Sequence, residues 1–369
     1  MFDQPNFWLV LSNLILYLTL YLLYSKAKRF PYAIAKEQHL FGLFLIMVFL
    51  EFSFWGNDWF HMYNFYTYLQ SGADTHMEDV YVWISQNLAP NYFVFRLVVW
   101  GGSLLLLIIM IEFLPIRKHL AYFMFVSFGL LWFSYARVSA AMIMMFCGLA
   151  LLYNKKRKLF IIKILALALI IGSFYFHKTA IFGIVIITLS ILWQEINGRY
   201  IILPVLAVVV ALFLNLDYSV EYFMNLDVES TTPLDRSITS GQNYLEYDVL
   251  DRSITYYVLK ALEQIPYYVL TIICIFLNKK KYALFPPQIQ VFVKVLILTV
   301  TVSFMLSFIQ ELNLQTITER LMRFAFLPTI IIMSYIWKKK HLKKISRYLI
   351  LFGLTSSMVS ILYSLYVHL

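Results

Sequence analysis

Long apolar runs follow one another along this chain, and short clusters of Lys and Arg separate them. Hydrophobic residues make up 61% of the 369 residues and charged residues only 14%. A helix needs about 20 apolar residues to cross a hydrocarbon core about 30 Å thick. Runs near this length cover residues 7–24, 39–55, 92–114, 119–135, 138–153, 159–176, 179–194, 200–216, 254–277, 288–309, 321–337 and 346–367. The pattern predicts an all-α, polytopic integral membrane protein, a single domain over residues 1–369 with about 12 transmembrane helices.

The basic residues are concentrated in alternate gaps between these runs. All but eight of the 30 Lys and Arg lie in or next to the gaps after the first, third, fifth, seventh, ninth and eleventh runs. This set includes Lys294, which lies just inside the tenth run, close to the gap after the ninth. Of the 20 Asp and Glu, all but Glu37, Glu112 and Glu195 fall on the opposite side. Cytoplasmic loops of membrane proteins are enriched in Lys and Arg. We therefore expect both termini on the outer side. The basic residues behind the net charge of +10 lie at the ends of predicted membrane helices, so the charge does not indicate a nucleic-acid partner.

Two segments on the predicted outer side are longer than turns, residues 56–91 and 217–253. In the first, Val80, Trp83, Ile84 and Leu88 have the spacing of a short interfacial helix that ends near Pro90. The second is polar and contains Leu-Asp-Arg-Ser-Ile-Thr twice, at 234–239 and at 250–255. The repeat either caps helices or presents its arginines, Arg236 and Arg252, to an anionic ligand.

Eight basic residues remain on the predicted outer side. They are Arg96, Arg137, Lys178, Arg236, Arg252, Lys260, Arg320 and Arg323. A charged side chain costs about 2.5–3.5 kcal/mol at the centre of a membrane helix and less near the interface. Guanidinium groups pair with phosphate oxygens through two parallel hydrogen bonds. The outer cations therefore predict an anionic ligand, and lipid-linked phosphates are the plausible ligands there.

Arg137 opens the run 138–153 and is followed by Val138-Ser139-Ala140-Ala141. Small residues let helices approach closely, so we expect Arg137 to point into the helix bundle. The alternative is an interfacial arginine that contacts lipid headgroups.

Arg320 and Arg323 are expected to open the run 321–337. Their spacing of three residues places them on one helical face, where they could clamp a pyrophosphate. The alternative is a salt bridge with Glu319 or Glu311.

His177 and Lys178 follow the run 159–176 at its predicted outer end. A histidine there could accept a proton or donate a hydrogen bond to phosphate. The alternative is an interfacial histidine with satisfied hydrogen bonds.

Asp58 directly follows the run 39–55, with Trp59, His61 and Tyr63 nearby. A carboxylate at this surface could act as the general base on a sugar hydroxyl. The alternative is a solvated loop carboxylate or a helix cap. The sequence contains no Walker-type loop, dinucleotide glycine motif, His-Glu-x-x-His or Cys-x-x-Cys, so we predict no cofactor and find no support for a metal site.

The order of these motifs is similar to that of a known family. The matching residues are Gly56-x-Asp58 with Tyr63, Arg137 with its small-residue helix, the basic turn Lys155–Lys158, His177-x-Thr179 and Arg320-x-x-Arg323-Phe324. Over most of residues 40–335 the chain resembles the EpsG/Wzy-type bacterial polysaccharide repeat-unit polymerases. The family often has an arginine shortly before Gly-x-Asp, where this chain has Glu51 and Trp55; Arg96 is a candidate to supply that phosphate contact.

The resemblance implies an enzyme of the bacterial cytoplasmic membrane, with a GT-C-like architecture and an active site facing outward. It would transfer a growing glycan from undecaprenyl pyrophosphate to a sugar hydroxyl of a lipid-linked repeat unit, in exopolysaccharide, capsule or O-antigen synthesis. Arg137, Arg320 and Arg323 would then bind pyrophosphate with His177 assisting, and Asp58 would be the base. Lys178, Arg96, Arg236, Arg252 and Tyr63 would contact pyrophosphate or glycan.

Membrane lipids, and a chain-length regulator or flippase, are the further partners considered. The alternative functions are a transporter of lipid-linked oligosaccharides and a lipid-dependent transferase of single sugars; a membrane acyltransferase is a weaker third.

Overall fold

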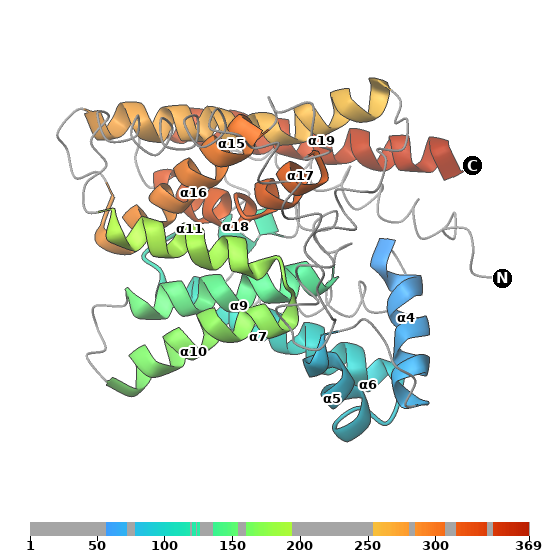
Figure 1. Ribbon diagram of the computed structural model, residues 1–369. Coiled ribbons are helices and arrows are strands. Elements are labelled where there is room, and N and C mark those ends of the chain that lie inside the picture. The colour runs from blue at the N-terminus through green and yellow to red at the C-terminus, as the bar shows by residue number, and fades with distance from the viewer. Residues whose placement is uncertain are drawn as a thin grey trace, which may run out of the picture.

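The structure is a computed structural model, and it describes residues 57–71, 78–118, 120–122, 124–125, 136–153, 160–193, 254–279, 285–306, 315–337 and 342–368. Every regular element in these ranges is helical. The elements are α4 (Asn57–Gln70), α5 (Asp79–Asn87), α6 (Tyr92–Arg96), the π-helix η1 (Leu97–Gly101), α7 (Gly102–Phe113), α9 (Ala136–Leu152), α10 (Phe160–Phe176), α11 (Ala180–Leu192), α15 (Ile254–Lys279), α16 (Pro287–Leu306), α17 (Gln315–Arg323), α18 (Phe326–Ile336) and α19 (Lys343–His368). Figure 1 shows α9, α10 and α11 side by side, with α15 and α19 along the opposite edge of the bundle.

The helices coincide with most of the predicted apolar runs that fall within the described residues. Two of them, Tyr92–Phe113 with 22 residues and Pro287–Phe304 with 18 residues, are long and apolar enough to cross a membrane. Four shorter apolar helices are Arg137–Leu152, Phe160–Phe176, Ala180–Leu192 and Leu262–Leu277. The runs 7–24, 39–55 and 200–216, and most of 119–135, lie outside the described residues. The total of about 12 spans and the outer position of both termini stay predictions.

The run 321–337 is not one helix, and Arg320 and Arg323 do not open it. They lie in the last turn of α17, which ends at Arg323 before α18 begins at Phe326. Pro328 has no N–H to donate to the carbonyl of Phe324, which favours a break here. The backbone N–H groups of Phe324 and Ala325 instead donate to the carbonyl oxygens of Leu321 and Met322, in tighter turns. The spacing of three residues still places both arginines on one face, and cations in a last helical turn are stabilised by the helix dipole.

The first outer segment contains two helices where the sequence predicted one. The predicted short helix is confirmed as α5, which ends at Asn87, before Pro90. Its buried side chains are Tyr81, Ile84 and Ser85, whereas Trp83 is exposed. The helix α4 was not predicted, although no Gly or Pro interrupts its sequence. The second outer segment, 217–253, lies outside the described residues.

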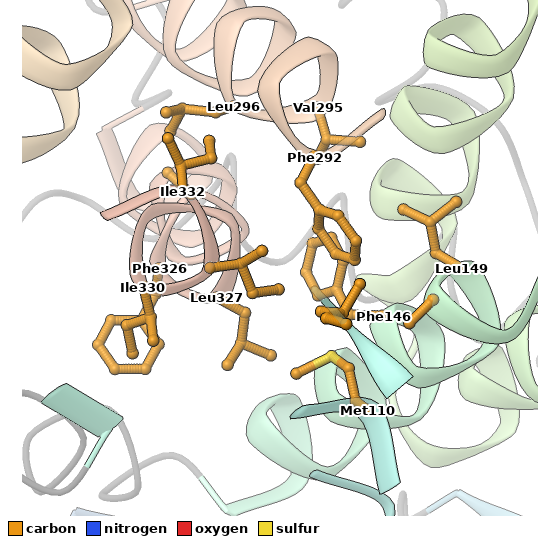
Figure 2. Close-up of a cluster of buried hydrophobic side chains, with 14 of the residues drawn as sticks. Met110, Phe146, Leu149, Phe292, Val295, Leu296, Phe326, Leu327, Ile330 and Ile332 are labelled. Carbon is orange, nitrogen blue, oxygen red and sulfur yellow. The ribbon is translucent and has the colours of Figure 1, made fainter. Parts of the chain in front are cut away.

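The main core lies between α7, α9, α16 and α18. Figure 2 shows Met110 of α7 and Phe146 of α9 facing Phe292 of α16 and Leu327 of α18. The Phe146 and Phe292 ring centroids are 6.0 Å apart. A smaller cluster joins α4, α5, α6, η1 and Ala140 of α9. This second cluster attaches α4, α5 and α6 to one end of the bundle.

The helices α9 and α10 approach each other closely. A Cβ atom built on Gly148 would lie 2.6 Å from the carbonyl oxygen of Ala166 and 3.2 Å from the backbone nitrogen of Ile170. Glycine therefore allows the two backbones to come into contact, as small residues commonly do in membrane bundles. This packing fixes the start of α9, where Arg137 lies, relative to the end of α10, where His177 follows.

Candidate functional site

A cluster of positive charges surrounds the turn between α10 and α11. His177 lies in this turn, and Lys178 follows it. Arg137 comes from the start of α9, and Arg320 and Arg323 come from the end of α17. All four cations lie close enough for their charges to act on the His177 imidazole. We call these five residues the cationic site. The fold therefore joins residues separated by up to 186 positions in the sequence.

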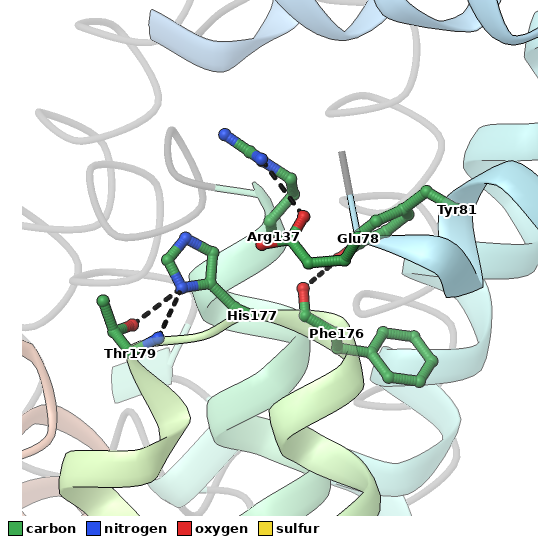
Figure 3. Close-up of polar contacts among 6 residues, drawn as sticks. All are labelled: Glu78, Tyr81, Arg137, Phe176, His177 and Thr179. Carbon is green, nitrogen blue, oxygen red and sulfur yellow. Dashed lines mark hydrogen bonds and ion pairs between the residues drawn. The ribbon is translucent and has the colours of Figure 1, made fainter. Parts of the chain in front are cut away.

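The imidazole of His177 is held in one tautomer. Its Nδ1 accepts a hydrogen bond from the backbone N–H of Thr179 at 3.1 Å and lies 2.8 Å from the Thr179 hydroxyl oxygen. A backbone N–H can only donate, so Nδ1 carries no proton. In the neutral ring the proton is then on Nε2, and Figure 3 shows this nitrogen turned away from Thr179, in the direction in which the Arg137 guanidinium extends. His177 therefore presents a hydrogen-bond donor to the site.

The environment of His177 keeps it neutral. Burial lowers the pKa of His177 well below its usual value, and the positive charges of Arg137, Arg320, Arg323 and Lys178 lower it further. Like charges oppose protonation, and desolvation disfavours the charged ring. The four cations and the Nε2 donor of neutral His177 together favour an anionic ligand at this site.

Acid is expected to destabilise the protein through this residue. The pKa of His177 in the folded protein lies below the value of about 6.5 expected in the unfolded chain, so the unfolded chain binds more protons below that pH. The stability that depends on neutral His177 is fully present above pH ~6.5 and is lost as the pH falls toward the folded pKa. The thermal midpoint of purified protein in detergent should fall more between about pH 7.5 and 5.5 in the wild type than in His177→Asn. Equal slopes would contradict this prediction.

An ion pair connects Arg137 to the outer helix α5. Arg137 Nη1 lies 3.2 Å from Oε2 of Glu78, the residue that precedes α5. The Glu78 side chain is 8% exposed and that of Arg137 is 26% exposed. Arg137 is therefore partly buried against the residue that precedes α5, and its predicted direction into the helix bundle stays a prediction. Glu78 has no distinguishing signal in the sequence, because it is one of several acidic residues in a polar segment and no motif marks it.

The same outer helix is fixed to the end of α10. The Tyr81 hydroxyl donates a hydrogen bond to the Phe176 carbonyl oxygen at 2.9 Å (Figure 3). The two rings meet edge to face, with centroids 5.9 Å apart. Since Phe176 directly precedes His177, this contact sets the distance between Glu78 and the imidazole.

The position of Arg323 depends on the residue after it. Phe324 is 1% exposed, and a Cβ atom on Gly183 of α11 would collide with its ring and with the side chain of Met145 of α9. The missing side chain of Gly183 thus leaves space for Phe324. Packing at this point holds the end of α17 against α9 and α11, which places Arg320 and Arg323 beside the His177 turn.

The other predicted site residues lie elsewhere or outside the described part. Arg96 is 4% exposed and its guanidinium carbon lies 5.8 Å from the Tyr92 ring centroid and 5.2 Å from that of Trp100, a cation–π arrangement. Tyr63 of α4 is 43% exposed and its ring meets Tyr92 edge-on at 5.2 Å. Both side chains contact aromatic rings, and their roles as ligands stay predictions.

Asp58 lies in the first turn of α4, and the structure describes its backbone but not its side chain. An acidic residue in the first turn stabilises a helix, and the roles considered for the Asp58 side chain stay predictions. Lys260 lies in α15, and Arg236 and Arg252 lie outside the described residues. In the ranges that the structure describes, no group of three His, Cys, Asp or Glu side chains could hold a metal ion.

Comparison with known proteins places the chain in a family. A family profile described as the EpsG family matches residues 39–368. No curated protein and no solved structure matches the chain. The match covers most of the sequence, including Arg137, His177, Arg320 and Arg323, and agrees with the resemblance carried by those motifs. The chain belongs to the EpsG family.

Proposed function

We propose that this protein is a membrane polysaccharide polymerase that transfers a growing glycan from a lipid-linked pyrophosphate to a hydroxyl group of a lipid-linked repeat unit. Membership of the EpsG family supports polysaccharide polymerisation in a membrane. The donor, the acceptor and the outward-facing reaction are our proposal. The observation that carries it is the gathering of four cations around a neutral His177 from three distant segments of the chain.

The chemistry of the transfer matches this arrangement. The bond between the anomeric carbon and the pyrophosphate oxygen breaks, and its electron pair leaves with the pyrophosphate. Preorganised donors that stabilise such developing charge accelerate reactions strongly. Arg137, Arg320 and Arg323 supply guanidinium groups, Lys178 supplies an ammonium group, and His177 donates from Nε2. No protonation step on the leaving group is needed, because a pyrophosphate departs as a stable anion.

Contacts between helices that are distant in sequence support the predicted division of the helix ends into an outer and an inner side. The outer segment contacts the predicted outer end of α10 through Tyr81 and Phe176. At the other surface, the backbone N–H of Arg117, after α7, donates to the Ser334 carbonyl oxygen near the end of α18. Lys294 donates to the carbonyl oxygen of Trp193 after α11. Each contact joins residues that the charge pattern assigns to the same side, and the cationic site lies at the side that this pattern predicts to be outer.

The proposal predicts a ladder of products. Purified protein in detergent or liposomes, supplied with a lipid-pyrophosphate-linked repeat unit, is expected to yield glycans that increase by whole repeat units, with release of lipid pyrophosphate. Electrophoresis or mass spectrometry of the glycan resolves the ladder. A single added sugar would identify a single-sugar transferase, and movement of intact substrate across liposomes without new bonds would identify a transporter. Either result would contradict the proposal.

A further inference from the structure

The attacking hydroxyl must lose a proton, and the cationic site itself offers no residue to accept it. Arginine is protonated at all relevant pH values and has no lone pair to offer. His177 cannot take the proton at Nδ1, because that nitrogen already accepts the Thr179 N–H, and its Nε2 carries the ring proton. A second group beside the site is therefore required if the reaction uses general base catalysis.

Glu78 is a carboxylate in direct contact with the site. Its Oε2 lies 3.2 Å from Arg137 Nη1, and only 8% of its side chain is exposed. A guanidinium group donates along more than one edge, so Arg137 can hold Glu78 on one edge and a phosphate oxygen on another. A phosphate held there would be separated from the Glu78 carboxylate by one guanidinium group.

The position of Glu78 is fixed by two independent contacts. Its backbone carbonyl accepts the N–H of Tyr81 at 2.9 Å, in the first turn of α5. The Tyr81 hydroxyl then donates to Phe176, the residue before His177, at 2.9 Å. The carboxylate is thus tied to both elements that carry the phosphate donors, α9 through Arg137 and the α10–α11 turn through Tyr81.

We propose that Glu78, rather than Asp58, is the general base that accepts the proton of the attacking sugar hydroxyl. This inference rests on the proposed function. The hydroxyl oxygen forms a bond to the anomeric carbon, its proton moves to the Glu78 carboxylate, and the bond to pyrophosphate breaks with its electron pair on the leaving oxygen. In this proposal Arg137 binds both the leaving pyrophosphate and the Glu78 carboxylate, so it stabilises the leaving anion and orients the base.

The test uses azide, a small anionic nucleophile that attacks without losing a proton. Glu78→Ala is expected to lower polymer formation by about 10²-fold or more, the usual contribution of a general base. Added azide should restore cleavage of the lipid-linked donor in this variant and yield a glycosyl azide, detected by mass spectrometry. Glu78→Gln, which keeps the side-chain volume and a hydrogen-bond acceptor for Arg137, should lose polymer formation to a similar degree.

Two comparison variants separate a base from a structural role. Glu112→Ala removes a carboxylate from another ion pair, with Lys118, after α7, and should leave polymer formation unchanged. Arg137→Ala should lose activity without rescue, because azide does not replace stabilisation of the leaving group. Failure of azide to rescue Glu78→Ala, or full activity of Glu78→Gln, would overturn the assignment. Rescue of Asp58→Ala instead would transfer the role to Asp58.

The two proposals fail in distinguishable ways. If the wild-type protein makes no polymer from a lipid-pyrophosphate-linked repeat unit, the proposed function is wrong. If it does make polymer and azide does not rescue Glu78→Ala, only the role of Glu78 is wrong.

Discussion

Arg137→Ala is expected to lower the rate of polymerisation by about 10²-fold or more, the typical effect of removing one preorganised donor to a developing negative charge. Arg137 is the largest charge contribution to the pKa of His177, and it also forms an ion pair with Glu78. The variant removes the guanidinium from the leaving pyrophosphate and also leaves a nearly buried carboxylate without this partner. Initial rates of polymer formation with purified protein measure the effect.

Arg137→Lys separates charge from geometry. An ammonium group keeps the charge but not the planar pair of donors that matches phosphate oxygens, so we expect an intermediate rate. Lys163→Ala removes a cation from the opposite end of α10, where its side chain is exposed, and serves as the control. An Arg137→Ala protein that is correctly folded, as judged by size-exclusion chromatography, and polymerises at the wild-type rate would remove Arg137 from the mechanism.

Gly148→Ala is expected to destabilise the protein more than any other single methyl addition at the glycines discussed above. Its Cβ would lie 2.6 Å from a backbone carbonyl oxygen, and backbone atoms cannot rotate away as a side chain can. Overpacking of this kind costs about 1–3 kcal/mol. Separation of α9 from α10 would also move Arg137 away from His177. We therefore expect a lower thermal midpoint in detergent together with reduced activity in the fraction that remains folded.

Gly102→Ala is the matched control for Gly148→Ala. Gly102 begins α7, and a Cβ built on it meets nothing within 4 Å. Alanine has a higher helix propensity than glycine by about 1 kcal/mol, so this variant should be as stable as the wild type or slightly more stable. Equal thermal midpoints for Gly148→Ala and Gly102→Ala would show that α9 and α10 do not approach as closely as the structure indicates.

The fold class could be predicted from the sequence because apolar run length has a direct physical cause. A run such as 92–114 must form a helix if it lies in lipid, since each backbone N–H and carbonyl must find a partner within the segment. The structure accordingly has helices over 92–113, 160–176 and 287–306. The break at Phe324 was missed because hydropathy does not distinguish one helix from two short helices, although Pro328 carried a signal.

The cations of the site could be selected from the sequence, because Lys and Arg are expected mainly on the cytoplasmic side of a membrane protein. A cation on the predicted outer side is therefore a candidate for binding an anionic ligand. Arg137, Lys178, Arg320 and Arg323 were selected on this ground, and His177 was selected as a titratable residue at the predicted outer end of a run. The structure brings the four cations within reach of the His177 imidazole. Arg96 was selected on the same ground, yet the structure places it between aromatic rings. Charge patterning identifies a cation near the membrane surface but not which neighbour it faces.

Glu78 could not be found by the same reasoning. Carboxylates are expected on the outer side, so an acidic residue there is not anomalous in sequence. Its contact with Arg137 spans 59 residues and depends on how α5 packs against α10. The Tyr81 to Phe176 hydrogen bond that fixes this packing spans 95 residues. Such contacts follow from tertiary structure and leave no local pattern.

The central claim, that the cationic site binds a pyrophosphate, is tested most directly by equilibrium binding of a short-chain prenyl pyrophosphate to purified protein. Hydrogen bonds to charged groups contribute about 1.5–3 kcal/mol each, and each 1.4 kcal/mol is a factor of about ten in affinity. The account predicts that replacing both Arg320 and Arg323 with Gln weakens binding about a hundredfold or more, while Lys163→Gln binds as the wild type does. Wild-type affinity in the double variant would contradict the claim.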